Sequence, residues 1–263
     1  MELGRLHEDS HLASREICWP ALQVGGASLM AQLSMATLSK TQIDRLGDRL
    51  RKGSPSEADL RLLDEYRRSF GEAYETVIRA IREQLRLEPT GRAAKSTSSI
   101  IEKLRRESIR LSQVQDIAGC RVIVEDIATQ NRIVASLQKK FPKSSIVDRR
   151  DKPSFGYRAV HVIPLVSGKL VEIQVRTFLQ HLWAELSEKL ADILDPAIKY
   201  GGGSDPIQKV LLYSSESVEV MENYERDYAQ RSPSSIETYR RHRQEFSKAF
   251  QNVISALLEE NET

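Results

Sequence analysis

The segment Leu170–Thr177 places a carboxylate, an amide and a guanidinium in one row. Its composition predicts a β-strand, and a strand points successive side chains to opposite faces. Glu172, Gln174 and Arg176 therefore share one face, while the alternate residues form an apolar core face. Contact with solvent is the ordinary explanation of such a polar face. Two further features of the chain favour a binding site instead.

A second carboxylate, that of Asp116, stands just before another predicted strand, in the segment DIAGCRVIV. If the two strands are neighbours, Asp116 and Glu172 can approach each other. Two nearby carboxylates repel, and a divalent cation relieves that repulsion. Mg²⁺ in particular is usually held by one or two carboxylates together with substrate phosphates. Capping of a turn or a helix is the alternative role for Asp116.

Basic side chains gather around these two segments, although the chain as a whole is nearly neutral. Lys and Arg number 39 and Asp and Glu number 37, a formal net charge of +2, so any basic site has to be local. The cluster comprises Arg92, Lys95, Lys103, Arg105, Arg106, Arg121, Arg149, Arg150 and Lys152. Charged faces are usually only solvated. Next to two carboxylates, however, the cluster predicts a site for phosphate and magnesium.

The apolar pattern predicts helices on both sides of a block of short strands. One long helix is expected between Ser56, its N-cap, and Pro89, followed by a basic loop over 91–98. The other expected helices cover 39–52, 99–106, 128–140, 178–194, 206–229 and 234–259. Strands are expected in GCRVIVED, SSIVDRR, YRAVHVIPLV and KLVEIQVRT, the last two joined by a hairpin at Ser167-Gly168. This order predicts an α+β protein with one central sheet.

Composition excludes several classes of protein. The chain has 263 residues, of which 40% are apolar and 29% charged, as in a globular protein with a sizeable core. Its two cysteines, Cys18 and Cys120, cannot build a disulfide framework or a cysteine-rich zinc site. Cys120 and Trp183 are expected in the core. No apolar run reaches the ~18 residues of a membrane helix, so we expect no membrane partner and a cytoplasmic location.

We expect three parts along the chain. Residues 1–38 are predicted to be a disordered leader, or an extension upstream of the native start. Residues 39–200 are predicted to hold the site, with helices at their N-terminal end. Residues 201–263 are predicted to be a helical extension that packs on this domain or on a second subunit.

Four segments together resemble the synthetase domain of RelA/SpoT proteins. They are RAAKSTSSIIEKLRR, DIAGCRVIV, FGYRAVHVI and VEIQVRTFLQHLWAELSEKL, and the resemblance covers roughly residues 60–195. It is closest to the small alarmone synthetases and their toxic relatives. The resemblance implies a nucleotidyltransferase-like fold, a mixed sheet of about five strands flanked by helices. It also implies Mg²⁺-dependent transfer of pyrophosphate from ATP to the ribose 3′-hydroxyl of GDP or GTP, which releases AMP and makes alarmones.

The resemblance also implies a role for each matching residue. Asp116 and Glu172 would be the magnesium ligands and catalytic carboxylates, and Glu172 would help to deprotonate the attacking hydroxyl. ATP would be bound by Arg92, Lys95, Ser96, Lys103 and Arg121. The acceptor would be bound by Tyr157, Lys152, His161, Gln174 and Arg176. Tyr157 would stack on the acceptor base, which is worth ~1–3 kcal/mol per base.

The loop before Tyr157 departs from the family pattern, and this loop bears on the identity of the acceptor. Asp148 is followed by two arginines, and Ser154-Phe155 precede Gly156-Tyr157. The toxic branch, which pyrophosphorylates the 3′ end of tRNA or makes adenosine alarmones, is therefore the second hypothesis. Its RNA track would be Lys139, Lys140, Lys143, Arg149, Arg150 and Lys152.

Three expectations about partners and activity stay open beside these hypotheses. An antitoxin and homo-oligomerisation are the partners that the resemblance implies. A non-catalytic nucleotide- or RNA-binding module is the third hypothesis. Against it, the carboxylates of Asp116 and Glu172 would repel a phosphate ligand.

Overall fold

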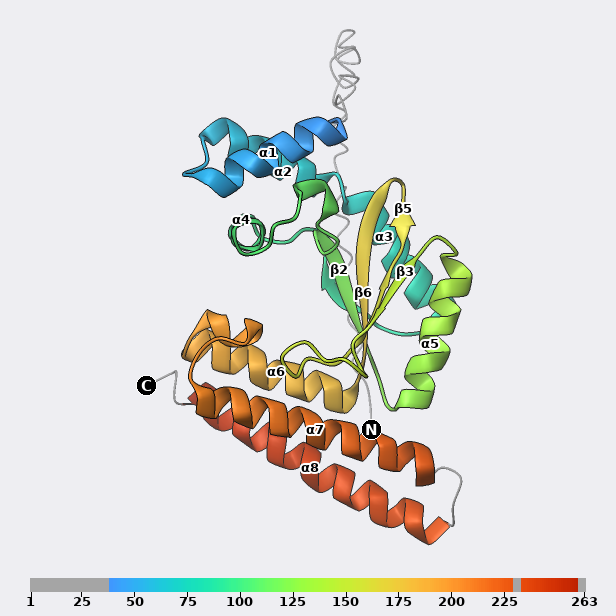
Figure 1. Ribbon diagram of the computed structural model, residues 1–263. Coiled ribbons are helices and arrows are strands. Elements are labelled where there is room, and N and C mark those ends of the chain that lie inside the picture. Colours follow the sequence, from blue (N-terminus) through green and yellow to red (C-terminus); the bar gives the residue numbers. More distant parts are fainter. Residues whose placement is uncertain (1–37, 229–232, 260–263) are drawn as a thin grey trace, which may run out of the picture. The chain divides into compact units, whose positions relative to one another are not determined.

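A computed structural model describes residues 38–228 and 233–259, so the predictions for the leader lie outside the described residues. The α+β class and the central mixed sheet are confirmed (Figure 1). Among the described residues, no helix is long and apolar enough to cross a membrane.

The sheet has six strands, where the resemblance implies about five. They are β1 Thr90–Arg92, β2 Ala118–Val124, β3 Ser145–Asp148, β4 Val160–Ile163, β5 Leu165–Val166 and β6 Lys169–Thr177. The main order is β1-β2-β6-β4-β3, and β5 pairs with β6. The β2 and β6 strands are parallel, whereas the other pairs are antiparallel. The two strands nearest the predicted carboxylates are therefore direct neighbours.

The basic loop predicted over 91–98 is wrong at its start, because β1 forms there. Thr90 pairs with Arg121, and Arg92 with Gly119, in an antiparallel register. The backbones lie so close that a side chain at Gly91 would place its Cβ 2.4 Å from the carbonyl oxygen of Gly119. A strand of three residues is too short to show alternation, which is why the sequence pattern hides it.

The single long helix predicted between Ser56 and Pro89 is also wrong. The chain forms α2 Glu57–Arg68, α3 Gly71–Ala80 and a π-helical turn at Ile81–Leu85. Between α2 and α3, the Ser69 hydroxyl donates to the carbonyl oxygen of Tyr66 at 2.6 Å. Such local side-chain bonds compete with the helix, and the glycine that follows weakens it further. The predicted N-cap Ser56 is confirmed.

The other predicted helices form close to their expected bounds. They are α1 Lys40–Lys52, α4 Thr97–Arg106, α5 Ile127–Lys140, α6 Phe178–Ile193, α7 Asp205–Tyr228 and α8 Pro233–Glu259. Short 3₁₀ turns lie at Leu111–Gln113 and at Pro196–Tyr200. Figure 1 shows α6, α7 and α8 lying together beside one end of the sheet.

The buried apolar residues form two clusters. The larger joins the sheet to the N-terminal helices and contains Cys120, which is 4% exposed. Burial raises the pKa of the Cys120 thiol to about 12. The smaller joins α6 to α7 and α8 around Trp183, which is 3% exposed. Both residues are thus buried, as the sequence predicts.

The hairpin predicted at Ser167-Gly168 is confirmed. Both turn residues are left-handed, with φ angles of 48° and 74°, and Val166 pairs with Lys169 across the turn. The strand predicted over 157–166 is shorter, because Pro164 separates β4 from β5. Proline has no N–H to donate to a neighbouring strand.

Candidate active site

The pocket at the end of β1, β2 and β6 brings both predicted carboxylates together. Asp116 and Glu172 line a cavity of about 320 Å³. Their basic and polar neighbours in its wall are Arg92, Arg121 and Gln174. The parallel register places Gly119 opposite Glu172, and a Cβ on Gly119 would lie 3.1 Å from the carbonyl oxygen of Glu172. A glycine on β2 thus keeps this side of the pocket clear.

The Asp116 carboxylate accepts hydrogen bonds from two lysines rather than capping a helix. Lys95 Nζ lies 2.6 Å from Oδ2, and Lys103 Nζ lies 3.0 Å from Oδ1. Lys103 comes from α4 and Lys95 from the loop before it. Burial alone would raise the pKa of Asp116, but Lys103 and Lys95 together lower it to about 2. The carboxylate therefore stays charged and holds α4 against the sheet.

Glu172 receives hydrogen bonds on both oxygens. Gln174 Nε2 donates to Oε2 at 2.7 Å, and His161 Nδ1 lies 2.9 Å from Oε1. His161 stands directly opposite Gln174 in the pairing of β4 with β6. Burial by itself would raise the pKa of Glu172, but the bonds from His161 and Gln174 hold it below its ordinary value. Glu172 is thus an oriented, ionised carboxylate.

A closed ring of hydrogen bonds continues from these two contacts, and we call it the Glu172 ring. Arg176 Nη2 donates to Gln174 Oε1 at 2.8 Å and to the Tyr157 hydroxyl at 3.1 Å. The Tyr157 hydroxyl lies 2.9 Å from His161 Nε2. Two chains of bonds therefore lead from one nitrogen of Arg176 to the two oxygens of Glu172. The polar face of β6 is not a solvated one, because Arg176 is only 3% exposed.

Three side chains near the ring keep buried nitrogens that have no hydrogen-bond partner in the described part of the chain. These are Arg121 Nε, Arg176 Nε and Nη1, and His181 Nδ1. Burial and then the charges of Arg121 and Arg176 lower the pKa of His181 to about 4, so its imidazole is neutral at pH 7. Sequence reasoning leaves His181 ambiguous, because its position on α6 carries no spacing signal of its own.

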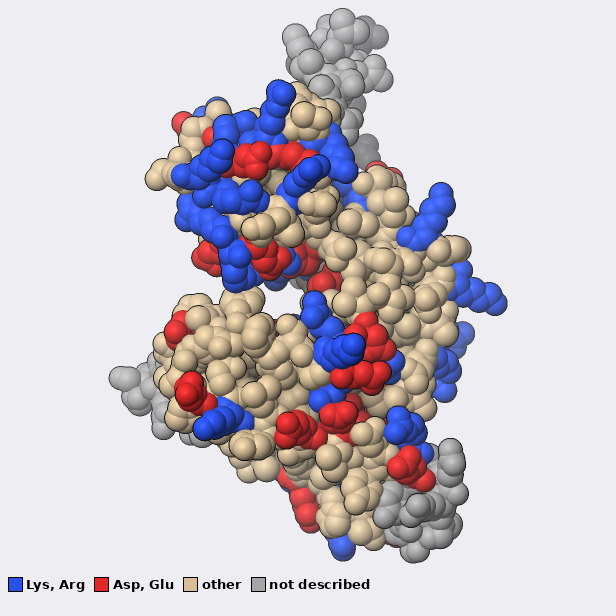
Figure 2. All heavy atoms as spheres, in the orientation of Figure 1, with Lys and Arg blue, Asp and Glu red and all other residues tan. Residues whose placement is uncertain are grey.

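Two predicted binding residues lie apart from the ring. The Ser96 hydroxyl caps α4 by accepting the backbone N–H of Ser99 at 3.2 Å. Lys152 is exposed in the loop between β3 and β4. The Arg106 guanidinium lies 3.6 Å from the centroid of the Tyr200 ring. This contact links α4 to the turn after α6, and Figure 2 shows Lys and Arg crowded over α1, α2 and α4 above the hollow there.

The donor set fits magnesium bound together with a substrate, but not a cation held by protein alone. Asp116 and Glu172 offer the hard oxygen ligands that Mg²⁺ prefers. Among the described residues, no group of three or more His, Cys, Asp or Glu side chains could hold a metal ion. Phosphate oxygens would have to complete the coordination.

The comparisons with known proteins agree with this architecture. Residues 91–191 match the region found in RelA/SpoT proteins. This segment thus carries the RelA/SpoT region. It contains Asp116, Glu172 and all of the Glu172 ring.

Two curated relatives and one solved structure illustrate the similarity. An uncharacterized protein of Mycobacterium tuberculosis is 41% identical over 111 residues, 41% of this chain and 41% of that protein. GTP pyrophosphokinase YjbM of Bacillus subtilis is 39% identical over 119 residues, 38% of this chain and 54% of the relative. The match thus spans about two fifths to a little over half of these relatives. A Streptococcus mutans crystal structure shares the fold at 23% identity and a TM-score of 0.50, covering 67% of this chain and 98% of that one.

Proposed function

We propose that this protein transfers the β,γ-pyrophosphate of ATP to the ribose 3′-hydroxyl of GDP or GTP and releases AMP. The observation that carries the proposal is the shared pocket of Asp116 and Glu172, one bonded to lysines and the other to the Glu172 ring. The name of the Bacillus subtilis relative, GTP pyrophosphokinase, gives the same reaction class.

The lysine side of the pocket suits the triphosphate of ATP. Lys95, Lys103 and Arg121 put three cations around the opening, and Arg92 adds a fourth on the exposed β1 edge. Phosphoryl chemistry depends mainly on positioning and on neutralising charge on the phosphate oxygens. Lysine is a compact charge on a flexible stem, so Lys95 and Lys103 can turn from Asp116 to a phosphate.

The ring side suits the nucleoside that is attacked. Tyr157 offers an aromatic face to the base, and Glu172 takes the proton of the 3′-hydroxyl. The oxygen then forms a bond to the β-phosphorus, while the bond from that phosphorus to the α,β-bridging oxygen breaks. AMP leaves with the bridging oxygen. The ring keeps Glu172 ionised and aimed before the substrate arrives.

Asp116 and Glu172 are also the residues that would hold Mg²⁺ against the phosphates. Bound there, the ion would withdraw charge from the oxygens of the transferred group. The remaining contributions come from the side chains described above.

The decisive assay supplies ATP labelled on the γ-phosphate and one acceptor at a time: GDP, GTP, ATP or deacylated tRNA. We expect label on GDP or GTP with one AMP formed per transfer, and none with Glu172→Gln. Label on tRNA or ATP would replace the acceptor but keep the chemistry. If no acceptor is labelled, the proposed function is wrong.

One contact makes the tRNA alternative the weaker one. The Arg150 guanidinium is bonded to the Asp148 carboxylate at 2.6 Å and to Asn131 at 2.7 Å, so it is not free to follow an RNA backbone. Lys139, Lys140, Lys143, Arg149 and Lys152 remain as the predicted track. An antitoxin and homo-oligomerisation stay predictions from the resemblance, and a cytoplasmic location stays a prediction from the composition.

A further inference from the structure

The α7 helix is bonded to the loop that carries Tyr157, although the two are far apart in sequence. The Ser215 hydroxyl donates to the carbonyl oxygen of Gly156 at 2.6 Å and accepts Arg158 Nε at 3.0 Å. Ser215 is 2% exposed and Arg158 is 7% exposed. The residues on both sides of Tyr157 are therefore held by one buried hydroxyl of α7.

Arg158 makes further bonds with its other two nitrogens. Its Nη2 donates to Glu219 Oε2, also on α7, at 2.6 Å. Its Nη1 donates to the carbonyl oxygen of Arg150, at the start of the same loop. Arg158 thus ties both ends of the loop to α7. Charge-assisted bonds of this kind are among the stronger hydrogen bonds in proteins.

The loop needs such support, because its backbone is strained just before Tyr157. Phe155 has a φ of 52° and Gly156 a φ of 88°, and only glycine adopts the left-handed region without cost. A Cβ at Gly156 would lie 2.6 Å from the ring of Trp183, so the backbone is pressed against α6. Strained segments persist only when their surroundings over-determine them. Here α6 and α7 are those surroundings.

A second attachment of α7 reaches the strand of the Glu172 ring. Thr177 follows Arg176 directly, and its hydroxyl donates to Glu222 of α7. Gln180 Nε2 donates to the same carboxylate at 3.1 Å. Burial raises the pKa of Glu222, and the bonds from Thr177 and Gln180 oppose that rise. The far end of β6 is thus fixed to the same helix as the loop.

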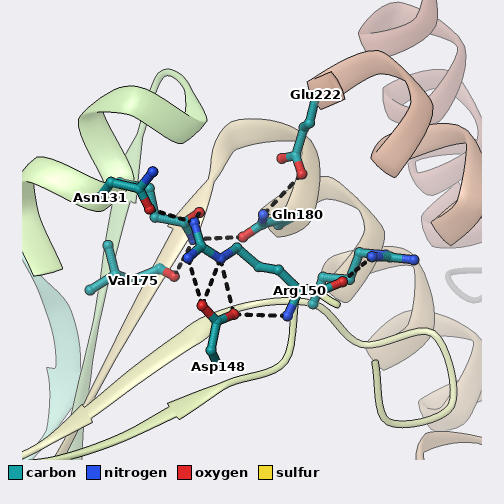
Figure 3. Close-up of polar contacts among 8 residues, drawn as sticks. Asn131, Asp148, Arg150, Val175, Gln180 and Glu222 are labelled. Atoms are coloured by element: carbon teal, nitrogen blue, oxygen red, sulfur yellow. Dashed lines mark hydrogen bonds and ion pairs between the residues drawn. The ribbon is translucent and has the colours of Figure 1, made fainter. Parts of the chain in front are cut away.

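Figure 3 shows the bonded side chains that lie between Arg150 of the loop and Glu222 of α7. Gln130 Nε2 donates to Gln180 Oε1 at 2.8 Å and to the carbonyl oxygen of Val175, also at 2.8 Å. Arg150 Nη1 lies 3.3 Å from Gln130 Oε1, while its Nε and Nη2 bind Asp148. The network runs from the loop through α5 to Glu222 without a break.

We propose that Ser215 and Glu219 are positioning residues of the acceptor site, and that α7 is the element which sets the place of Tyr157. Neither residue lines the pocket of Asp116 and Glu172. They act through the Gly156 carbonyl and the Arg158 guanidinium. The inference rests on the proposed function, in which Tyr157 binds the acceptor.

The main test is Ser215→Ala, measured with ATP and GDP. The change leaves the buried Arg158 Nε and the Gly156 carbonyl short of a partner, so the loop relaxes. We expect the KM for GDP to rise about tenfold, while the KM for ATP changes by less than about twofold. The matched control is Ser217→Ala on the same helix, whose hydroxyl donates to the Tyr213 carbonyl of its own turn at 2.9 Å. It should leave both constants unchanged.

A second pair of variants separates hydrogen bonding from loss of the fold. Glu219→Gln keeps an oxygen for Arg158 Nη2, whereas Glu219→Ala removes it. We expect Glu219→Ala to raise the KM for GDP about fivefold and Glu219→Gln to restore most of the loss. Glu216→Ala, an exposed acid on α7, is the charge control. If Ser215→Ala melts below the assay temperature, the Glu219 pair decides.

Direct binding of GDP keeps this proposal separate from the proposed function. Calorimetric titration should give a weaker GDP affinity for Ser215→Ala than for the native chain, whether or not pyrophosphate is transferred. A folded Ser215→Ala protein with unchanged GDP affinity would overturn the positioning role. Equal losses for GDP and ATP would also overturn it, since they indicate a general structural effect. If the native chain binds GDP but transfers nothing, only the proposed function falls. If it binds neither GDP nor GTP, both fall.

Discussion

The two carboxylates of the pocket are held in different ways. Asp116 is held by the charges of Lys95 and Lys103, which come from α4 and the loop before it. Glu172 is held by the directed hydrogen bonds of a closed ring that begins at Arg176. In the first arrangement, the ammonium groups of the two lysines can leave Asp116 and bind the oxygens of a triphosphate. In the second arrangement, directed hydrogen bonds fix the orientation of Glu172. Buried bonds from α7 support the loop and the strand that carry this ring.

This difference indicates a division of labour. Flexible lysines can exchange a carboxylate for a phosphate with little movement of the backbone. A base that must meet one hydroxyl hydrogen needs a defined orientation before the substrate arrives. The lysine side should therefore govern the binding of ATP, and the Glu172 ring the binding and activation of the acceptor. The following predictions test that division.

The largest effect is expected where both sides meet. Glu172→Gln keeps the shape of the side chain and one of its two accepted ring contacts but cannot take the proton, so the rate of AMP formation with ATP and GDP should fall about a hundredfold or more. The control is Glu188→Gln, a neighbouring acid on α6 that lies 3.6 Å from Arg121. A Glu172→Gln enzyme that keeps more than about a tenth of the rate would contradict the role of the base.

A smaller and one-sided effect is expected on the lysine side. Lys103→Met removes a cation that binds Asp116, so the KM for ATP should rise about tenfold, whereas the KM for GDP should stay within about twofold. Lys140→Met, at an exposed site in the last turn of α5, is the matched control. Initial rates at varied ATP and GDP give both constants. Equal changes in the two KM values would contradict the division between an ATP side and an acceptor side.

The corresponding substitution in the Glu172 ring should have a smaller effect. Tyr157→Phe keeps the aromatic face and removes only the hydroxyl that joins Arg176 to His161. We expect the KM for GDP to rise about fivefold, with that for ATP nearly unchanged. Tyr200→Phe is the control, because Tyr200 contacts Arg106 through its ring. A change confined to ATP would argue against a place for Tyr157 in the acceptor site.

The smallest effect concerns stability, and it comes from His181 on α6. His181 has a pKa of about 4 in the folded state against an ordinary 6.5, because burial and the charges of Arg121 and Arg176 disfavour its protonation. The unfolded chain therefore binds a proton first as the pH falls. The contribution of His181 to the free energy of unfolding is therefore fully present above pH 6.5 and is lost as the pH falls toward 4.

Urea unfolding measures that contribution. Between pH 7 and pH 5 the native chain should lose about 1–2 kcal/mol more unfolding free energy than His181→Asn. His242→Asn, at an exposed position on α8, should behave like the native chain. An imidazole NMR titration of His181 with a midpoint near its ordinary value would contradict the assignment.

Much of the site could be predicted from the sequence, because it depends on local rules. The alternation within β6 places Glu172, Gln174 and Arg176 on one face, and Ser167-Gly168 fixes the hairpin before them. The core positions of Cys120 and Trp183 follow from apolar periodicity in the same way. The prediction of one long helix before Pro89 was wrong, because the side-chain bond of Ser69 and the glycine at position 71 interrupt the helix despite the unbroken apolar stripe.

Other features are absent from any local pattern. That His161 faces Gln174 depends on the register of β4 on β6, and the contact of Arg158 with Ser215 joins residues 57 positions apart. Pairing of this kind is decided by which strands and helices pack together, not by the spacing of residue types along the chain.

The sequence by itself thus determined the class of the fold, the polar strand and the two acids, since these follow from short-range periodicity and residue chemistry. Only the tertiary structure decided that lysines hold Asp116, that a closed ring orients Glu172, and that α7 supports the loop before Tyr157. Those are long-range contacts, and their geometry exists only once the sheet and the helices have packed.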